Sequence, residues 1–451
     1  SDTGTSSAAL PSDVMKRFVH AGLMPAIPLY KGYPLTHSVI DPTPFPYPAA
    51  PNAAPGRPNL VFTLVEQLNW EFVTSFSKQL SGVMPELSAL SQRMTRVTEY
   101  QSTANPTIHA LVASLCSLHA ASHYRDVNRG RAGDALTGTP FVCLPKILKD
   151  LGYRTVFIQG GEKTFASKEA FLHAHGFEEV HGRPELEQRF PGTDISRWGL
   201  HDDVLVAYVQ EQIARLEKLR AQDGRPYFVM MLTLDTHSPG LPPPDCQLPK
   251  NLERISSDRD SRTMLRALHC TDLSLGKLGR FILDDPARSR STLWAVTGDH
   301  PTSAMRFVRD LFSRQGKPYS GWSGRLPLML YDPTHQLPQR VAVLSSHIDL
   351  APTLLHMLGV KEAPSAMMGL SIFGLRREHP MLVGRVGPKY VALYRPGRTE
   401  SLTMGALRDR CTNKEPVLAN DRIALSSCDL LHWVTWQDTL WSQKKLFPAK
   451  H

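Results

Sequence analysis

Two side chains that could bind a metal ion stand next to each other about two thirds of the way along the sequence. Asp299 and His300 follow the apolar run Leu293 to Val296, so they lie just past an expected buried strand. Open α/β sheets carry their chemistry at the carboxyl ends of their strands. An ordinary capped strand end can have the same residues, and the tetrapeptide Thr297 to His300 alone leaves both interpretations open.

A second candidate ligand ends an apolar run far upstream. The segment Asn59 to Val65 (NLVFTLV) is typical of another buried strand, and the carboxylate Glu66 follows it directly. Two strands would thus deliver acidic groups to the same edge of one sheet.

Thr107 lies between these two strands, just after Pro106 and before the helical run Ala110 to Leu118. Proline is favoured at the start of a helix, so Thr107 is expected in the first turn, where free backbone N–H groups and the helix dipole attract a phosphate or sulfate oxygen. Taken alone, a threonine that simply initiates a helix is the simpler interpretation.

Together, Glu66, Thr107, Asp299 and His300 supply oxygen and imidazole ligands for one divalent cation, Zn or Mn, and a hydroxyl that the cation could activate. The hypothesis is a metal-activated threonine nucleophile.

Composition limits the partners. The chain has 451 residues, 41% of them hydrophobic, and a formal net charge of +9, which favours an anionic partner such as a phosphate-bearing substrate or a membrane headgroup. The sequence has no long Lys/Arg block, no RNA-binding signature and no zinc-finger spacing, so no nucleic acid is expected as a partner.

The six cysteines form three sequential pairs, each closing a local loop. Pairing of Cys116 with Cys143, Cys246 with Cys270 and Cys411 with Cys428 would suit an oxidising compartment. None has the CxxC spacing of a zinc or redox motif, but six buried free thiols remain the alternative.

From Asn59 onward, strand-like and helix-like patterns alternate, which predicts an α/β fold with a mixed, mostly parallel sheet covered by helices on both faces.

The chain divides into three parts. Residues 1–58 hold an amphipathic run, Val14 to Met24, and a proline-rich arm or linker, and residues 59–379 would form the catalytic domain. A C-terminal subdomain, 380–451, would pack on it with strands at Met381 to Gly384 and Lys389 to Tyr394, a Trp-rich tail and a small antiparallel unit. The other expected elements are strands at Tyr153 to Ile158, Tyr227 to Leu234, Thr292 to Thr297 and Leu326 to Tyr331, and helices at Pro85 to Met94, Asp202 to Leu219 and Ser261 to Leu283.

The sequence lacks an apolar stretch long enough to span a membrane and it does not begin with Met. We therefore expect a soluble domain of a membrane-anchored protein. From the cysteine pairs, we expect it to be extracytoplasmic, in the periplasm, at the cell surface or in the secretory lumen.

Taken in chain order, the motifs resemble the alkaline phosphatase superfamily, in its sulfatase-like branch with lipoteichoic acid synthases and phosphoethanolamine transferases. The phrases that carry the resemblance are NLVFTLVEQLNW, STANPTIHALVASL, GYRTVFIQGGEKTF with HGFEEV, WGLHDDVL, YFVMMLTLDTHSPG, HCTDLSLGKLGRFI, WAVTGDHPTS, LPLMLYDP and SSHIDLAPTLLHMLG.

The resemblance implies an alkaline phosphatase-like α/β/α sandwich and roles for individual residues. Glu66, Thr107, Asp299 and His300 would bind one divalent metal, with Thr107 as the nucleophile. His237, in DTHSP, matches a substrate-contacting histidine that holds or protonates the transferred group. His347 and Asp349 are interpreted as a packing and capping motif at a helix start.

The sequence also departs from the family in places that bear on its chemistry. Sulfatases open with paired aspartates and carry a Cys or Ser that becomes formylglycine, where this chain has a lone Glu66 and Thr107. Lipoteichoic acid synthases have a Trp and an Arg that contact glycerol phosphate where this chain has Ala166 and Lys168. Lys168 could still meet the substrate anion as a point charge.

The resulting hypothesis is a metal-dependent phosphotransferase that moves a phosphoethanolamine or phosphoglycerol group from an anionic phospholipid donor to a glycan or lipid acceptor through a phosphothreonine intermediate. Phosphodiester hydrolysis, sulfuric ester hydrolysis and a catalytically inactive binding protein are the alternatives.

Overall fold

The structure is a computed structural model in which the chain folds into two compact units, each built from separate segments. The first unit comprises Ser1–Phe45, Thr103–Leu144 and Leu344–His451, and the second comprises Pro46–Ser102 and Pro145–Val343. The structure describes residues 10–20, 24–41, 56–78, 80–103, 105–119, 137, 140–256, 258–302, 324–374, 382–386, 390–395, 398–412 and 426–449. The boundaries expected at residues 58 and 379 remain a prediction.

An eight-stranded sheet forms the centre of the second unit. Its strand order is β10 (Arg340–Val341), β3 (Thr95–Val97), β9 (Leu328–Tyr331), β8 (Thr292–Gly298), β2 (Asn59–Val65), β7 (Tyr227–Leu232), β5 (Arg154–Gln159) and β6 (Glu179–His181). Strand β9 is antiparallel to both neighbours, and all other neighbouring pairs are parallel. The mixed, mostly parallel sheet predicted from the sequence is confirmed.

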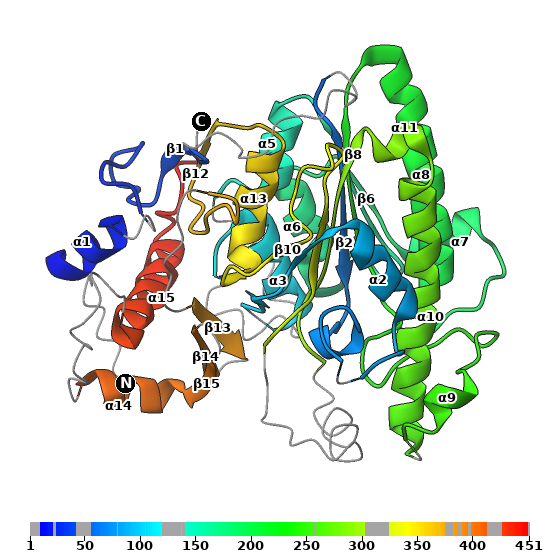
Figure 1. Ribbon diagram of the computed structural model, residues 1–451. Coiled ribbons are helices and arrows are strands. Elements are labelled where there is room, and N and C mark those ends of the chain that lie inside the picture. The colour runs from blue at the N-terminus through cyan, green and yellow to red at the C-terminus, as the bar shows by residue number, and fades with distance from the viewer. Residues whose placement is uncertain are drawn as a thin grey trace. The chain divides into compact units, whose positions relative to one another are not determined.

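Helices cover the sheet on both faces (Figure 1). Helices α2 (Pro85–Leu90), α8 (Asp202–Asp223) and α10 (Arg259–Leu283) share one apolar core with alternate residues of β2, β5 and β7. Helices α5 (Leu144–Asp150) and α6 (Lys168–Ala174) lie on the other face. Every residue of β2 is buried, as expected for a strand covered on both sides.

The remaining elements of this unit are short. They are β4 (Tyr100–Gln101), α7 (Arg183–Arg189), α9 (Lys250–Glu253), α11 (Pro286–Ser289) and the 3-10 turns η1 (Trp70–Phe72), η2 (Ser91–Arg93) and η4 (Phe165–Ser167).

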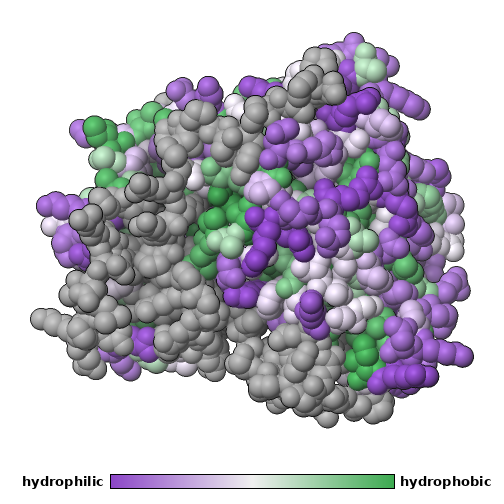
Figure 2. All heavy atoms as spheres, in the orientation of Figure 1, coloured by the Kyte–Doolittle hydropathy of each residue, from purple (hydrophilic) through white to green (hydrophobic). Residues whose placement is uncertain are grey.

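The predicted helices of this unit are present with shifted ends. The helix expected over Pro85 to Met94 stops at Leu90 and continues as the 3-10 turn η2. Helix α8 runs past its expected end to Asp223, where Gly224 terminates it with a φ of 76° that favours glycine. The outward sides of α8 and α10 carry mostly hydrophilic residues, at the right of Figure 2, so these helices are amphipathic.

The first unit carries the other described helices and short strands. Its elements are α1 (Ser12–His20), β1 (His37–Val39), α3 (Thr107–Cys116), β11 (Ser345–Ser346), η5 (His347–Asp349), α13 (Leu350–Met357), β12 (Glu362–Ser365), β13 (Leu382–Val386), β14 (Tyr390–Arg395), β15 (Arg398–Thr403), α14 (Met404–Thr412) and α15 (Ser427–Ser442).

The C-terminal antiparallel unit predicted from the sequence is confirmed as the three-stranded sheet β13–β14–β15. The Trp-rich tail forms helix α15, which starts with a capping box between Ser426 and Asp429. Met381 and Lys389, the first residues of the two expected strands, lie outside the described residues. In the N-terminal arm, β1 pairs antiparallel with β12.

The three disulfides expected from sequential pairing are present. Cys116 bonds to Cys143 and Cys411 to Cys428 in the first unit, and Cys246 bonds to Cys270 in the second. The alternative of six free thiols is therefore wrong. Among the described residues, every helix is too short or too polar to cross a bilayer.

Two buried aspartates join the start of α8 to the loop after β7. Asp202 accepts hydrogen bonds from the backbone N–H groups of Leu234 (2.7 Å) and Asp235 (3.2 Å), and from the Thr271 hydroxyl (2.7 Å). In return, Asp235 accepts the backbone N–H of Asp202 at 2.9 Å. The two carboxylates thus cap each other's backbone and fix the loop that carries His237.

His201 compensates part of the charge buried in this pair. Its Nδ1 lies 2.7 Å from Asp235 and its Nε2 lies 3.2 Å from Asp194. Burial lowers the pKa of His201, but the Asp235 and Asp194 carboxylates outweigh burial and raise the pKa to about 9. Burial and the Asp235 carboxylate raise the pKa of Asp202 above its ordinary value.

These shifts predict that stability falls as pH rises. The folded-state pKa of His201 lies above the ordinary 6.5, so its contribution is complete below pH 6.5 and is lost as pH rises through about 9. The pKa of Asp202 is also raised in the folded state, so Asp202 adds a further loss of stability as pH rises. The unfolding free energy of the parent protein should decrease as pH rises across this window. In His201→Gln we expect that decrease to be roughly 2 kcal/mol smaller.

Chemical denaturation of the chelator-treated protein at pH 6, 7.5 and 9 measures this effect. His173→Gln, on α6 and outside the network, serves as the control and should leave the pH dependence of the parent protein intact. An equally steep pH dependence in His201→Gln would contradict the prediction.

Candidate metal centre

Strand pairing brings the first two predicted ligands to one edge of the sheet. Strands β2 and β8 are parallel neighbours in which Val65 lies opposite Gly298. Glu66 and Asp299 are the next residues on the two strands, and adjacent strands lie about 4.8 Å apart. The register alone therefore places both carboxylates side by side.

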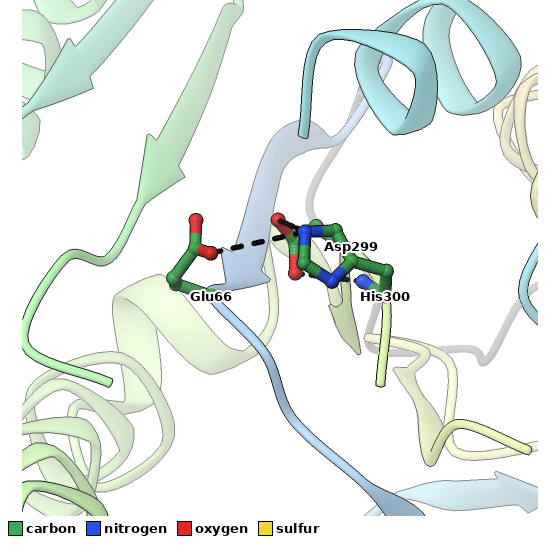
Figure 3. Close-up of side chains that lie close together, drawn as sticks. All are labelled: Glu66, Asp299 and His300. Carbon is green, nitrogen blue, oxygen red and sulfur yellow. Dashed lines mark hydrogen bonds and ion pairs between the residues drawn. The ribbon is translucent and has the colours of Figure 1, made fainter. Parts of the chain in front are cut away.

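Glu66, Asp299 and His300 form a compact buried group, shown in Figure 3. One possible ligand atom from each lies within 4.8 Å of the others. His300 Nε2 is 3.8 Å from Glu66 Oε1 and 3.4 Å from Asp299 Oδ2. The exposed fractions of Glu66, Asp299 and His300 are 3%, 0% and 3%, so solvent does little to screen the two carboxylates.

The hydrogen bond at the back of the His300 ring selects its tautomer. Nδ1 lies 3.0 Å from the backbone carbonyl oxygen of Pro301. A carbonyl oxygen can only accept, so Nδ1 carries the proton and donates it. In the neutral ring the Nε2 lone pair then faces Glu66 and Asp299, which is the form of histidine that binds a metal.

Asp299 is oriented by backbone donors on one oxygen only. Its Oδ1 accepts the N–H groups of Gln67 (2.8 Å) and His300 (2.7 Å). Its Oδ2 is buried and makes no hydrogen bond within the described part of the chain, although it faces His300 Nε2. A buried carboxylate oxygen left in this way is costly unless it meets a cation. Two carboxylate oxygens and one imidazole nitrogen form a donor set that fits Zn or Mn.

Lys168 lies in the same unit, at the first residue of α6. Its Nζ donates to Gln159 Oε1 at 2.8 Å. Burial lowers the pKa of Lys168 to about 8, while the Glu66 and Asp299 carboxylates act in the opposite direction. The lysine therefore stands within electrostatic reach of the buried carboxylates.

His237 lies in the turn that follows β7. Its Nδ1 is 3.1 Å from the carbonyl oxygen of Ser238, so Nδ1 donates and Nε2 keeps its lone pair in the neutral ring. Burial lowers the pKa of His237 against the effects of this hydrogen bond and of Asp299. The shift favours the neutral imidazole near pH 7, which suits an acceptor better than a proton donor.

An aromatic wall formed by Phe165 and Trp198 borders His237. The Trp198 ring centroid lies 4.7 Å from that of His237 and 5.9 Å from that of Phe165. The Arg197 guanidinium stands 5.5 Å from the Trp198 centroid, and Lys168 Nζ stands 5.7 Å from the Phe165 centroid. Phe165 is 50% exposed, so the wall has a free apolar face beside two cations.

Two glycines let the loops that carry this wall touch. A Cβ on Gly199, whose φ is 147°, would lie 2.2 Å from the carbonyl oxygen of Gly160. The backbone N–H of Leu200 donates to that same oxygen at 3.0 Å. Larger residues here would push the Trp198 loop away from the loop after β5.

Thr107 belongs to the first unit, where it is the first residue of α3 and follows Pro106. Its expected place in the first turn of a helix is confirmed. Nearby, Thr103 is engaged with His347, whose Nδ1 lies 3.3 Å from the Thr103 backbone nitrogen. Asp349 accepts the N–H of Ser346 at 2.9 Å, which confirms that the His347–Asp349 segment is a capping motif.

Sequence reasoning missed four groups that shape this region: Gln67, Trp198, His201 and Asp235. Trp198 and His201 lie in WGLHDDVL and Asp235 in TLDTHSPG, two phrases that carried the family resemblance. These two motifs indicated the family, but no local sequence pattern assigned a role to Trp198, His201 or Asp235.

Comparison with known proteins places the chain in a family. The family model described as Sulfatase matches residues 58–360. Phosphoglycerol transferase I of Xanthomonas campestris pv. campestris (strain ATCC 33913) is 30% identical over 308 residues, which cover 67% of this chain and 41% of the relative. The protein of the same name from Escherichia coli O127:H6 is 27% identical over 248 residues, covering 54% of this chain and 30% of the relative. The chain therefore spans less than half the length of these relatives.

Solved structures show the same fold. A protein in the alkaline phosphatase superfamily from Vibrio parahaemolyticus aligns with a TM-score of 0.70 at 18% identity, covering 98% of both chains. The lipoteichoic acid synthase LtaP from Listeria monocytogenes aligns with a TM-score of 0.63 at 16% identity, covering 88% of this chain and 95% of that one. The resemblance inferred from the motifs is thus confirmed: the chain belongs to the Sulfatase family of enzymes and has the fold of a solved protein of the alkaline phosphatase superfamily.

Proposed function

We propose that this protein is a metal-dependent phosphotransferase that moves a phospho-headgroup from a phospholipid to a glycan or lipid acceptor. The observation that carries the proposal is the buried group of Glu66, Asp299 and His300 at the strand ends of a Sulfatase-family chain. The similarity to proteins named phosphoglycerol transferase I supports the transfer of phosphoglycerol in particular.

Glu66, Asp299 and His300 would hold one divalent ion, Zn or Mn, and we propose Thr107 as the fourth ligand. When bound, such an ion lowers the pKa of a hydroxyl and stabilises negative charge on phosphate oxygens. The proposal for Thr107 is supported by its place at the start of α3, because the N-terminal end of a helix carries a partial positive charge that attracts an anion, and by the family position that it matches.

The chain's own residues would then act in two displacements. In the first, Thr107 Oγ1 loses its proton and forms a bond to phosphorus, while the bond from phosphorus to the glycerol oxygen of the diacylglycerol breaks and that oxygen takes up a proton. In the second, an acceptor hydroxyl loses its proton and forms a bond to phosphorus, while the bond from phosphorus to Thr107 Oγ1 breaks and Oγ1 takes up a proton.

His237 and Lys168 would assist these steps from the second unit. With its pKa lowered, His237 is neutral near pH 7 and can accept the proton of the attacking hydroxyl or a hydrogen bond. Lys168 supplies a point charge to a phosphate oxygen. If water replaced the acceptor, the same intermediate would be hydrolysed, so phosphodiesterase activity is the alternative outcome of this mechanism.

We also propose an extracytoplasmic location. The three disulfides support it, because disulfides form and persist in oxidising compartments. The net charge of +9 is compatible with an anionic phospholipid donor.

Removal of two ligands tests the metal assignment. We expect the double variant Asp299→Asn plus His300→Ala to retain the fold and to lose the bound divalent metal, because two of the three buried donors are weakened or absent. Elemental analysis after dialysis against limiting Zn or Mn gives the stoichiometry. Glu179→Gln plus His181→Ala removes a carboxylate–histidine pair elsewhere in the unit and should leave the metal content near one per chain. Equal metal in the parent protein and the Asp299/His300 variant would remove the assignment.

Replacement of Thr107 tests the nucleophile. Thr107→Ala should keep the fold and lose turnover by several orders of magnitude, as the removal of a covalent nucleophile usually does. Thr103→Ala is the neighbouring control and should keep turnover within a few-fold of the parent.

Intact-mass measurement after incubation with phosphatidylglycerol or phosphatidylethanolamine gives the second readout. We expect an adduct on the parent chain and on Thr103→Ala, with the added mass identifying the donor group, and no adduct on Thr107→Ala. An adduct that persists in Thr107→Ala would place the nucleophile elsewhere.

A further inference from the structure

Gln67 occupies an unusual position directly after the predicted ligand Glu66. Its exposed fraction is 3%, and its backbone has a φ of 51°, in the left-handed region that residues other than glycine rarely adopt. Such a conformation costs about 1 kcal/mol or more and persists only where the surroundings hold it in place.

The side chain of Gln67 joins two loops that carry the site. Its Oε1 accepts the hydroxyl of Ser238 at 2.6 Å and that of Thr302 at 3.0 Å. Ser238 follows His237, and Thr302 lies two residues after His300. One buried amide oxygen therefore binds the loop after β7 to the loop after β8.

The backbone of the same residue orients a ligand. The N–H of Gln67 donates to Asp299 Oδ1 at 2.8 Å, the oxygen opposite the one that faces His300. The backbone N–H and the side-chain oxygen of Gln67 thus both bond to residues around the candidate metal centre.

Two further bonds tie the preceding residue to the same loop. The Thr233 hydroxyl accepts the backbone N–H of Glu66 at 2.9 Å, and the Thr236 hydroxyl donates to the Glu66 carbonyl oxygen. The backbone of Glu66 is therefore fixed to the end of β7 from both sides. Asn69 Oδ1 accepts the backbone N–H of Thr302 at 2.7 Å, and the Gln67 side chain adds the bond that reaches the loops after β7 and β8 at once.

We propose that Gln67 is a positioning residue, a clamp that couples the order of the His237 loop to the geometry of the Asp299–His300 ligand pair. The coupling rests on the proposed function in one respect, since the Asp299–His300 pair is a ligand pair only if the site binds metal. The clamp requires the amide oxygen for the two hydroxyls and the backbone N–H for Asp299.

Gln67→Met is the sharpest variant, because it keeps the length of the side chain and its burial while removing the acceptor. In the metal-free protein we expect faster backbone hydrogen exchange over residues 235–241 and 299–302, with little change over α8. This readout needs neither metal nor substrate. Unchanged protection in both loops would overturn the clamp.

Metal titration of the same variant gives the second readout. Gln67→Met keeps the backbone N–H that bonds to Asp299 but releases the hydroxyl of Thr302, two residues after the proposed ligand His300. Loss of a group that orients the surroundings of a ligand usually weakens metal binding 10- to 100-fold, and we expect a loss in this range for Zn or Mn measured by calorimetry. If the parent protein binds no metal, the metal centre of the proposed function fails, and hydrogen exchange still decides the clamp. If the parent binds metal and Gln67→Met binds it equally well, the coupling fails and the proposed function stands.

Controls separate positioning from a general loss of stability. Gln437→Met removes another fully buried glutamine, which bonds to the backbone of His119 in the first unit, and should leave the metal affinity unchanged. Gln67→Glu keeps an oxygen for both hydroxyls and should restore protection in the two loops. If Gln67→Met does not fold, Ser238→Ala and Thr302→Val each remove one of the two bonds, and each should raise exchange in its own loop.

Discussion

The feature on which the rest of the site depends is the parallel pairing of β2 with β8, because it fixes two carboxylates side by side in a buried place. Val65 pairs with Gly298, so Glu66 and Asp299 leave the sheet together. Like charges at this separation repel strongly where solvent is excluded. Part of this cost is reduced by the surroundings: backbone N–H groups bind one oxygen of Asp299, and the Lys168 ammonium lies within electrostatic reach. The His300 lone pair that faces both acids adds to the negative potential. A divalent cation would complete the neutralisation.

The loops around this edge are held by polar groups rather than by apolar packing. Asp202 and Asp235 cap each other's backbone below the His237 turn, and Gln67 gathers hydroxyls from the loops on both sides of β2. Buried hydrogen bonds of this kind contribute about 1 kcal/mol each when made and cost more when one partner is removed. They specify one loop conformation, which is what a reaction centre needs from its supporting residues.

The sheet and the close approach of Glu66, Asp299 and His300 could be predicted from the sequence, because both follow from local patterns. Strand β2 is a continuous apolar run that ends in an acid, and the predicted bounds Asn59–Val65 are those of the structure. Gln67 could not be predicted in the same way, since its partner Ser238 lies 171 residues away and no periodicity links them. The helix in the Trp-rich tail did have a signal, because Ser426 and Asp429 have the spacing of a capping box, but the tail was taken with the antiparallel unit.

Charge beside the metal centre bears on the choice between the two donor groups. Lys168 and Arg197 are both cations close to the aromatic wall, and Arg197 acts on the pKa of His237 in the same direction as burial. A phosphoethanolamine group brings its own ammonium, which two neighbouring cations would repel, whereas the glycerol of a phosphoglycerol group is uncharged. Lysine interacts with phosphate as a point charge and lacks the planar bidentate geometry of arginine. Lys168 would therefore recognise the phosphate itself more than the group attached to it. On electrostatic grounds the two cations beside this wall disfavour a second cation on the transferred group and favour an uncharged one.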